Sequence, residues 1–162
     1  MEMHEHFPIF IKTAGSKVIV VGGGKIAQRR IQTLAKFDFE ITVLSTQITD
    51  DIQKLRDAGR ICHVPDVFDP QKPEPFLHLV EDALMVLACT DDSDVNGQIG
   101  ALCKSHGIQV NLCDDQKEST FWFPAIATND ELVMGLVGNG KSHETVRNAA
   151  ARLRQIIEER QY

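Results

Sequence analysis

The sequence lacks the features that mark membrane proteins, exported proteins and nucleic-acid-binding proteins. No apolar run approaches the roughly 20 residues that a membrane-spanning helix needs, and the polar opening segment, residues 1–6, does not resemble a signal peptide. Lys and Arg number 17 against 23 Asp and Glu, so the chain has no basic surplus for binding phosphate backbones. We therefore expect a soluble, cytoplasmic protein that binds neither membranes nor nucleic acids.

Cysteine is scarce, and its spacing carries no metal-binding pattern. The four cysteines show no CxxC spacing and the six histidines are scattered along the chain, so no metal site is expected. Three of the cysteines fall in apolar strand-like runs, and Cys103 falls on the apolar face of a predicted helix. We interpret all four as small buried apolar residues in a reducing compartment. They are Cys62, Cys89, Cys103 and Cys113.

Strand-like and helix-like segments alternate through the first two thirds of the chain. The expected strands are residues 17–21, 40–44, 60–64, 83–88 and 108–113, and the expected helices are residues 25–36, 49–58, 76–80 and 93–106. Alternation with continuously apolar strands is typical of a parallel sheet that is covered on both faces. The sequence thus predicts an α/β fold with a Rossmann-like doubly wound parallel sheet.

The pattern changes after Asp115. Two more strands are expected at residues 121–126 and 132–137, followed by a helix with Ser142 as its N-cap. We expect these elements to form a small strand–strand–helix extension. An apolar stripe on the helix packs either on its own strands or against a second subunit. The stripe consists of Val146, Ala149, Ala150, Leu153, Ile156 and Ile157.

A glycine-rich turn follows the first expected strand. Residues 22–27 have the sequence Gly-Gly-Gly-Lys-Ile-Ala, which fits G-x-G-x-x-G/A between a strand and a helix. In this pattern Gly22 permits the tight turn, Gly24 lets the backbone approach a pyrophosphate, and Ala27 lets the helix pack closely on the strand. The helix N-terminus offers N–H groups and a partial positive charge. The turn therefore predicts a dinucleotide-binding site.

The acidic residue that usually binds the ribose 2′-hydroxyl is missing. At that position, about 20 residues after the glycines, the chain has Ser45, Thr46 and Gln47, whose side chains can hydrogen-bond the ribose instead. No arginine stands there to bind a 2′-phosphate. These residues favour NAD over NADP.

Two acidic pairs follow the fourth and fifth expected strands, where ligands bind in open α/β sheets. Asp91 or Asp92 is interpreted as the N-cap of the next helix, and Thr90 beside them can face the nicotinamide half of a cofactor. No clear helix follows Asp114, so capping explains it poorly. Asp114 is either a turn-forming residue or a carboxylate that moves a proton during hydride transfer.

Five motifs in order resemble those of the precorrin-2 dehydrogenases, a family that includes the N-terminal module of bifunctional siroheme synthases. The resemblance covers nearly the whole chain. The motifs are FPIF at residues 7–10, VVGGGKIAQRR at 20–30, ACTDD with Val95 and Asn96 at 88–96, VNLCDD at 110–115 and FWFPA at 121–125.

The resemblance implies an oxidoreductase that uses NAD to convert precorrin-2 to sirohydrochlorin in siroheme biosynthesis, a branch of porphyrin biosynthesis. It implies an NAD-binding Rossmann domain at residues 1–115, and a segment at residues 116–162 that serves homodimerisation and substrate binding. It makes Asp114 the catalytic residue. The expected cofactor-binding residues are Gly22, Gly23, Gly24, Lys25, Ile26, Thr46, Gln47, Thr90 and Asp91.

The implied substrate, precorrin-2, carries eight carboxylates, so an acidic protein needs local cations to bind it. The candidates are Arg29, Arg30, Lys117, Lys141 and Arg147.

The chain also departs from the family pattern. A family serine is replaced by Gly138, and the proline that usually follows Ser142 is absent. Larger family members continue into a further helical region where this sequence stops. On that ground we expect a dehydrogenase alone, rather than one that also inserts Fe²⁺ or Co²⁺. Two competing interpretations of the sequence are a non-enzymatic NAD-sensing domain and an NADP-linked reductase of another small molecule.

Overall fold

The computed structural model describes residues 5–140 and 142–159. Contacts divide the chain into two compact units. Lys12–Phe121 forms the first, which we call the sheet unit, and the described parts of Met1–Ile11 and Trp122–Tyr162 form the second, which we call the hairpin unit. The predicted roles of residues 1–115 and 116–162 concern ligands and subunits, and they remain predictions.

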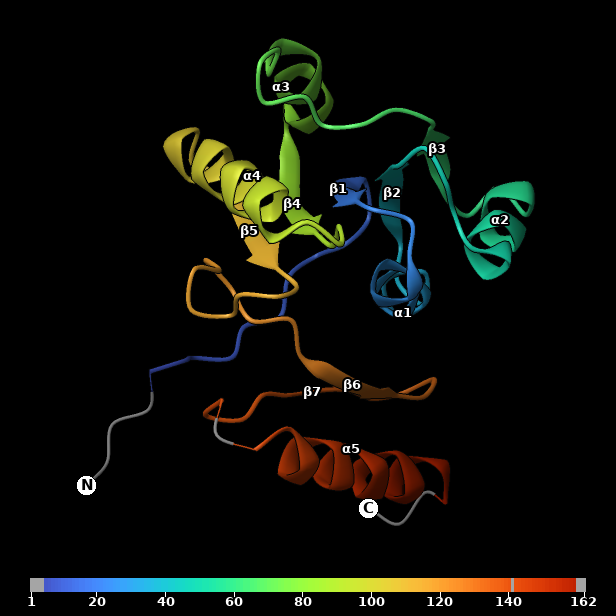
Figure 1. Cartoon of the computed structure of the whole chain (residues 1–162). Coiled ribbons are helices and arrows are strands. Elements are labelled where there is room, and N and C mark those ends of the chain that lie inside the picture. The colour runs from blue at the N-terminus through green and yellow to red at the C-terminus, as the bar shows by residue number, and fades with distance from the viewer. Residues whose placement is uncertain (1–4, 141, 160–162) are drawn as a thin grey trace. The chain divides into compact units, whose positions relative to one another are not determined.

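The sheet unit is built on five parallel strands in the order β3-β2-β1-β4-β5 (Figure 1). Strands β2 and β3 lie on one side of β1, and β4 and β5 lie on the other. The strand order therefore reverses between β1 and β4, which is the switch point of the sheet. The predicted Rossmann-like parallel sheet is therefore confirmed. The strands are β1 (Ser16–Val21), β2 (Phe39–Leu44), β3 (Cys62–Val64), β4 (Ala83–Ala88) and β5 (Gln109–Leu112).

Four helices cover this sheet on both faces, α3 and α4 on one side and α1 and α2 on the other (Figure 1). They are α1 (Lys25–Leu34), α2 (Asp50–Asp57), α3 (Glu74–Val80) and α4 (Ser93–Ser105). The expected bounds of these elements differ from the observed ones by only one or two residues at their ends.

The strands are buried because both of their faces pack against helices. Alternate residues such as Ile19 and Val21 lie in a cluster with Phe76 of α3 and Ile99 of α4, and the intervening residues face the other side. In β4 and in residues 18–21 of β1 both residue sets are apolar, which is the pattern expected of a covered parallel sheet.

The hairpin unit contains two antiparallel strands, β6 (Ala125–Thr128) and β7 (Val133–Leu136), and the helix α5 (His143–Glu158). The prediction of a strand over residues 121–126 is wrong, because the strand begins only at Ala125. Pro124 has no N–H to donate to a ladder. Phe121 is held elsewhere, since its carbonyl accepts a hydrogen bond from Asn111 Nδ2 at 3.1 Å.

Helix α5 packs on its own hairpin, the first of the two arrangements that the sequence left open. Ser142 is the N-cap as predicted, with its hydroxyl accepting from Thr145 N at 3.2 Å. Ile157 of the apolar stripe is 1% exposed, whereas Ile156 is 37% exposed. The hairpin therefore covers only part of the stripe. Within the described residues, no helix is both long enough and apolar enough to cross a membrane.

Candidate functional site

The glycine turn lies at the switch point, immediately after β1. Gly22 has φ +109°, a conformation that L side chains rarely adopt, and a Cβ there would collide with the carbonyl oxygen of Cys89 at the end of β4. Gly22 N also donates to the Leu44 carbonyl at 2.9 Å. Only glycine therefore fits where the ends of three neighbouring strands meet, which confirms the tight turn expected at this position.

Gly23 has a packing role that the sequence did not reveal. A Cβ on Gly23 would collide with the carbonyl oxygen of Gln47, and the Gly23 carbonyl accepts from Thr49 N at 3.1 Å. The Ser45 hydroxyl donates to the same Gln47 carbonyl at 2.7 Å. Ser45 thus braces the loop after β2 from within, and Thr49 ties that loop to the turn, while the side chains of Thr46 and Gln47 are exposed.

Gly24 differs from the two glycines before it. A Cβ built on Gly24 would meet no atom of the chain within 4 Å. Gly24 is the N-cap of α1, where no side chain accepts from the helix N–H groups and the first turn holds no acidic residue. Exposed Lys25 and Ile26 follow. The open space and the uncapped N–H groups suit the pyrophosphate of a dinucleotide, so these residues fit the expected cofactor.

A hydrogen-bonded network, which we call the strand-end network, joins the ends of β4 and β5 on the other side of the switch point. Asn96, buried on α4, accepts from Thr90 N at 3.1 Å and from the Thr90 hydroxyl at 2.7 Å through its Oδ1. Its Nδ2 donates to the Thr90 carbonyl at 3.2 Å and to Asp114 Oδ2 at 3.0 Å. The network therefore brings together two predicted site residues, Thr90 and Asp114, that are 24 positions apart in the sequence.

Asp114 also accepts a short hydrogen bond of 2.6 Å from the Ser93 hydroxyl, again on Oδ2. Partial burial favours the neutral acid, but the hydrogen bonds from Ser93, Asn96 and the backbone outweigh it and hold the pKa of Asp114 below its ordinary value. Asp114 is therefore a carboxylate at neutral pH. Its side chain points to the start of α4, so a turn alone does not account for it.

The other acids at this edge have different roles. Asp92 is the N-cap of α4 and accepts from Asp94 N at 2.9 Å and from Val95 N at 3.1 Å. The capping role predicted for Asp91 or Asp92 thus belongs to Asp92. Asp91 is exposed and lines a shallow hollow with Asp92, Ser93 and Asp94.

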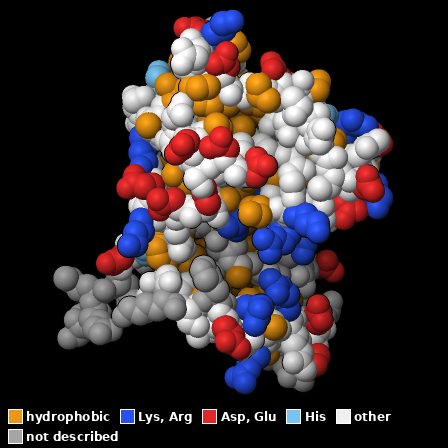
Figure 2. Space-filling model, in the orientation of Figure 1, with side chains coloured by type: hydrophobic (Ala, Val, Ile, Leu, Met, Phe, Trp, Pro, Cys, Tyr) orange, Lys and Arg blue, Asp and Glu red, His pale blue; other side chains and the backbone are white. Residues whose placement is uncertain are grey.

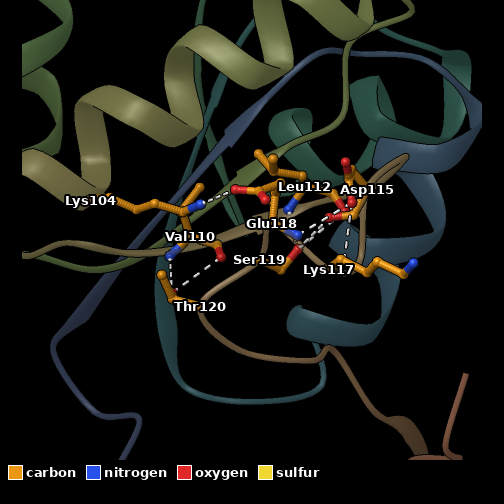
Figure 3. A network of polar contacts seen from close by, with 8 residues as sticks. All are labelled: Lys104, Val110, Leu112, Asp115, Lys117, Glu118, Ser119 and Thr120. Carbon is orange, nitrogen blue, oxygen red and sulfur yellow. Dashed lines mark hydrogen bonds and ion pairs between the residues drawn. The ribbon is translucent and has the colours of Figure 1, made fainter.

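Several hydrogen bonds fasten the loop that follows β5 and begins beside Asp114 (Figure 3). Asp115 Oδ1 accepts from the backbone N–H groups of Lys117 and Glu118, at 3.1 and 3.2 Å. Leu112 N donates to the Ser119 hydroxyl at 2.9 Å, and Val110 N to the Thr120 hydroxyl at 2.8 Å. An ion pair of 2.7 Å also joins Lys104 on α4 to Glu118 in the loop. Sequence reasoning missed the roles of Glu118, Ser119 and Thr120, because their partners lie on other elements, α4 and β5.

The structure corrects the prediction that all four cysteines are free apolar residues. A disulfide joins Cys89 and Cys113, and the Cα atoms of the two residues are 5.2 Å apart. They follow the last paired residues of β4 and β5, and each directly precedes a site residue, Thr90 or Asp114. Cys62 is a free, exposed thiol. Cys103 is a free, buried thiol, and burial raises its pKa to about 12.

Basic side chains gather over α1, whereas acidic side chains gather over the start of α4 (Figure 2). Arg29 on α1 is exposed. Burial and the nearby Arg29 charge lower the pKa of Arg30. The ammonium group of Lys117 extends away from the loop network (Figure 3). The cations nearest in sequence to the glycine turn therefore form one group on α1.

The last two candidate cations belong to the C-terminal part of the sequence. Arg147 is exposed on α5 in the hairpin unit, and Lys141 lies outside the described residues. Among residues 5–140 and 142–159, no cluster of three or more His, Cys, Asp or Glu residues could hold a metal ion.

Gly138, where the family pattern has serine, lies close to helix α5. A Cβ on Gly138 would approach Cγ2 of Val146, on α5, to within 2.6 Å. A serine at position 138 would therefore require Val146 to shift. The two positions are matched to each other in this chain.

The glycine turn at a switch point, the covered parallel sheet and the polar ends of β4 and β5 together define a dinucleotide-binding protein of the Rossmann class. The chain belongs to the family described as "Putative NAD(P)-binding", whose model matches residues 9–125. A nicotinamide dinucleotide is therefore its cofactor type.

Similar proteins agree with the motifs. The chain is 34% identical over 155 residues to the "Probable multifunctional siroheme biosynthesis protein HemA" of Ruminiclostridium josui, covering 95% of this chain and 29% of that protein. It is 34% identical over 151 residues to a "Siroheme synthase" of Psychrobacter sp. (strain PRwf-1), covering 93% of this chain and 30% of that protein. The chain thus spans about 30% of the length of these relatives.

A solved structure named "SirC, precorrin-2 dehydrogenase" has the same fold. It matches with a TM-score of 0.73 and 20% identity, covering 96% of this chain and 76% of that chain. Together with the two relatives, this match confirms the predicted resemblance to siroheme synthases and precorrin-2 dehydrogenases.

Proposed function

We propose that this chain is an NAD-dependent precorrin-2 dehydrogenase that makes sirohydrochlorin, acting on a CH–CH bond of its donor. The observation that carries the proposal is the strand-end network, in which an ionised Asp114 is held beside Thr90 at the edge of the sheet that bears the glycine turn. The similarity to siroheme synthases and to a precorrin-2 dehydrogenase supports this assignment.

The cofactor in this proposal is NAD, bound at the switch point. The open space at Gly24 and the uncapped start of α1 suit its pyrophosphate. The exposed side chains of Thr46 and Gln47 suit its ribose. Residues 45–47 include neither the acid that usually binds the 2′-hydroxyl nor an arginine that would bind the 2′-phosphate of NADP. Bound NAD⁺ supplies the acceptor for the two electrons that leave the tetrapyrrole as a hydride. Thr90 and Asp91 complete the proposed set of contacts.

Asp114 is the proposed catalytic residue. Oxidation of precorrin-2 releases one proton besides the hydride, and a carboxylate that is ionised at neutral pH can accept this proton or hold a pyrrole N–H in position. Because acidic residues crowd the start of α4, we assign the substrate carboxylates to cations elsewhere. Exposed Arg29 on α1 is the favoured candidate in the sheet unit.

The direct test is anaerobic incubation of the purified protein with precorrin-2 and NAD⁺. We expect sirohydrochlorin and reduced nicotinamide to appear in equal amounts by absorbance, and NADP⁺ to support a lower rate. Binding of NAD⁺ without turnover would replace the proposal with a non-enzymatic NAD-sensing role. Insertion of Fe²⁺ into sirohydrochlorin in the absence of NAD⁺ would add the chelatase activity that we do not expect.

The matched variant is Asp114→Asn, which preserves the shape of the side chain and removes its charge. We expect turnover to fall about 100-fold to 10,000-fold, which is the usual contribution of a positioned proton acceptor to the rate. Folding and NAD⁺ affinity should be retained. Unchanged turnover would remove Asp114 from the mechanism.

The proposal also includes a homodimer in the cytoplasm. Apolar side chains that stay exposed on the hairpin unit, among them Val133 and Ile156, support a subunit contact there. Light scattering of the purified protein tests the dimer, and a monomeric mass at micromolar concentration would remove it from the proposal.

A further inference from the structure

Among the described residues of the strand-end network, Asn96 alone contacts both Thr90 and Asp114 through its side chain. It lies on the first turns of α4 and is 1% exposed. An asparagine amide offers two acceptor positions and two N–H groups. Both acceptor positions are used by Thr90, and the two donors go to the Thr90 carbonyl and to Asp114 Oδ2. The amide is therefore fully occupied between the ends of two adjacent strands.

The second donor to Asp114 has a different character. Ser93 is exposed, and its hydroxyl donates to Oδ2 of Asp114 at 2.6 Å, the same oxygen that Asn96 contacts. Among the described residues, the side-chain hydrogen bonds to this carboxylate all go to Oδ2. Two side-chain donors from α4 on one oxygen, together with the backbone N–H groups of Asp114 and Asp115, restrain the orientation of the carboxylate.

We propose that Asn96 and Ser93 are positioning residues of the dehydrogenase, which hold Asp114 by Oδ2 in one orientation toward the tetrapyrrole. This inference rests on the proposed function, because it assigns a role toward the same substrate. Asn96 additionally ties Thr90, the proposed nicotinamide contact, to Asp114. One amide thus sets the distance between the cofactor side and the acid side of the site.

The chemistry explains why an amide serves here better than other side chains. A carboxylate at position 96 has no N–H for Asp114 and adds a like charge beside it. An apolar side chain leaves the buried N–H of Thr90 without its acceptor. Serine is too short to span from Thr90 to Asp114. The same network both keeps Asp114 ionised and fixes its orientation.

A purely structural role for Asn96, as a support for the backbone at Thr90, is separable from this inference. Ser93→Ala tests it best, because Ser93 is exposed and its described side-chain hydrogen bond goes to Asp114 rather than to Thr90, so the variant should fold normally. Asn96→Asp keeps the side-chain shape and the acceptors for Thr90, but it loses the donors to the Thr90 carbonyl and to Asp114 and adds a like charge beside Asp114. The control is Ser105→Ala at the other end of α4, where the hydroxyl donates to the Leu102 carbonyl and is hydrogen-bonded to His106.

The first measurement is the dependence of kcat/KM for precorrin-2 on pH, with the NAD⁺ dissociation constant measured in parallel. Removing a donor to an ionised carboxylate raises the pKa of that carboxylate, so the acid limb of the profile should move to higher pH. We expect this shift in Ser93→Ala and a larger one in Asn96→Asp, with kcat/KM falling about 10-fold to 100-fold in the latter near neutral pH. Profiles that coincide with that of Ser105→Ala would overturn the inference.

The second measurement needs no substrate. The Asp114 carboxyl carbon is followed by NMR during a pH titration of the wild type and the same variants. We expect its midpoint to rise in Ser93→Ala and to stay unchanged in Ser105→Ala. An unchanged midpoint in Ser93→Ala would overturn the inference even in an active enzyme. If the wild type fails to oxidise precorrin-2, the proposed function fails alone, and the titration still decides whether these residues control Asp114.

Discussion

The sheet unit buries its apolar side chains almost completely, whereas the hairpin unit leaves many of its own exposed. In the sheet unit the large exposed apolar residues are Ile26 and Val67. In the hairpin unit they are Phe7, Ile9, Phe10, Ile11, Val133, Val137 and Ile156. The sheet unit therefore completes its own core, while the hairpin unit, with two short strands and one helix, offers too little surface to do so.

The two units also differ in where their polar contacts lie. The sheet unit gathers its buried polar groups, Asn96 and Asn111, at the ends of β4 and β5, where the site is proposed. The hairpin unit uses its polar contacts to fasten α5 to the hairpin, as when Asn129 Nδ2 donates to the Ile157 carbonyl at 3.3 Å. This contrast supports chemistry in the sheet unit and assembly in the hairpin unit.

The largest expected effect comes from the glycine turn of the sheet unit. Gly23→Ala places a Cβ on the Gln47 carbonyl, and because backbone rather than a flexible side chain must move, we expect a loss of more than about 4 kcal/mol of unfolding free energy or failure to fold. The matched control is Gly24→Ala, whose Cβ meets nothing within 4 Å. This control should fold normally and bind NAD⁺ more weakly. Urea unfolding and NAD⁺ titration check both variants, and equal stability of the two would contradict the packing role of Gly23.

A smaller effect is expected in the hairpin unit, where adjacent residues of one helix form a matched pair. Ile157→Ala leaves a cavity at a buried position and should lower the unfolding free energy by about 2 to 5 kcal/mol. Ile156→Ala, at a partly exposed position, should lower it by less than about 1 kcal/mol. Trp122, the single tryptophan, lies in this unit against the ring of His6, with centroids 3.8 Å apart. Its fluorescence during urea unfolding therefore reports on the hairpin unit. Equal costs for both variants would show that α5 does not pack as described.

A weaker effect is expected from the charge of Asp114 on the stability of the sheet unit. The folded chain lowers the pKa of Asp114 below its ordinary value of 3.8, so the folded state favours the ionised form. The resulting stabilisation is fully present above that ordinary value and is lost as the pH falls through the lower folded pKa. In Asp114→Asn this contribution should be absent. The melting temperature of the variant should therefore fall less than that of the wild type between neutral and acid pH. Parallel curves for both proteins would argue against the lowered pKa.

The smallest expected effect concerns the reactivity of the thiols, which is measured without any substitution. In the native protein an exposed-thiol reagent should modify Cys62 quickly and Cys103 very slowly, because the Cys103 pKa is raised to about 12 by burial. Unfolding without reductant should expose two thiols in total, and reduction should expose all four. Four reactive thiols before reduction would contradict the disulfide between Cys89 and Cys113.

Features that neighbouring residues determine were predicted correctly, and features that depend on residues distant in the sequence were not. The cap at Ser142, the turn at Gly22 and the strand Ala83–Ala88 follow from a few neighbouring residues, and each was predicted correctly. The strand expected over residues 121–126 was wrong, because the apolar aromatic run there is held through Phe121 to Asn111 and interrupted by Pro124. Local propensity did not reveal the hydrogen bond to Asn111, and the prediction did not allow for the missing N–H of Pro124.

The sequence by itself determined the order of strands and helices, the glycine turn and the acids that end β4 and β5, because hydrophobic periodicity and turn chemistry are local properties. Only the tertiary structure decided that Asn96 joins Thr90 to Asp114, that Gly23 packs on Gln47 and that Cys89 meets Cys113. These contacts depend on which strands become neighbours, and the pairing of parallel strands is set by crossovers that bring distant segments together.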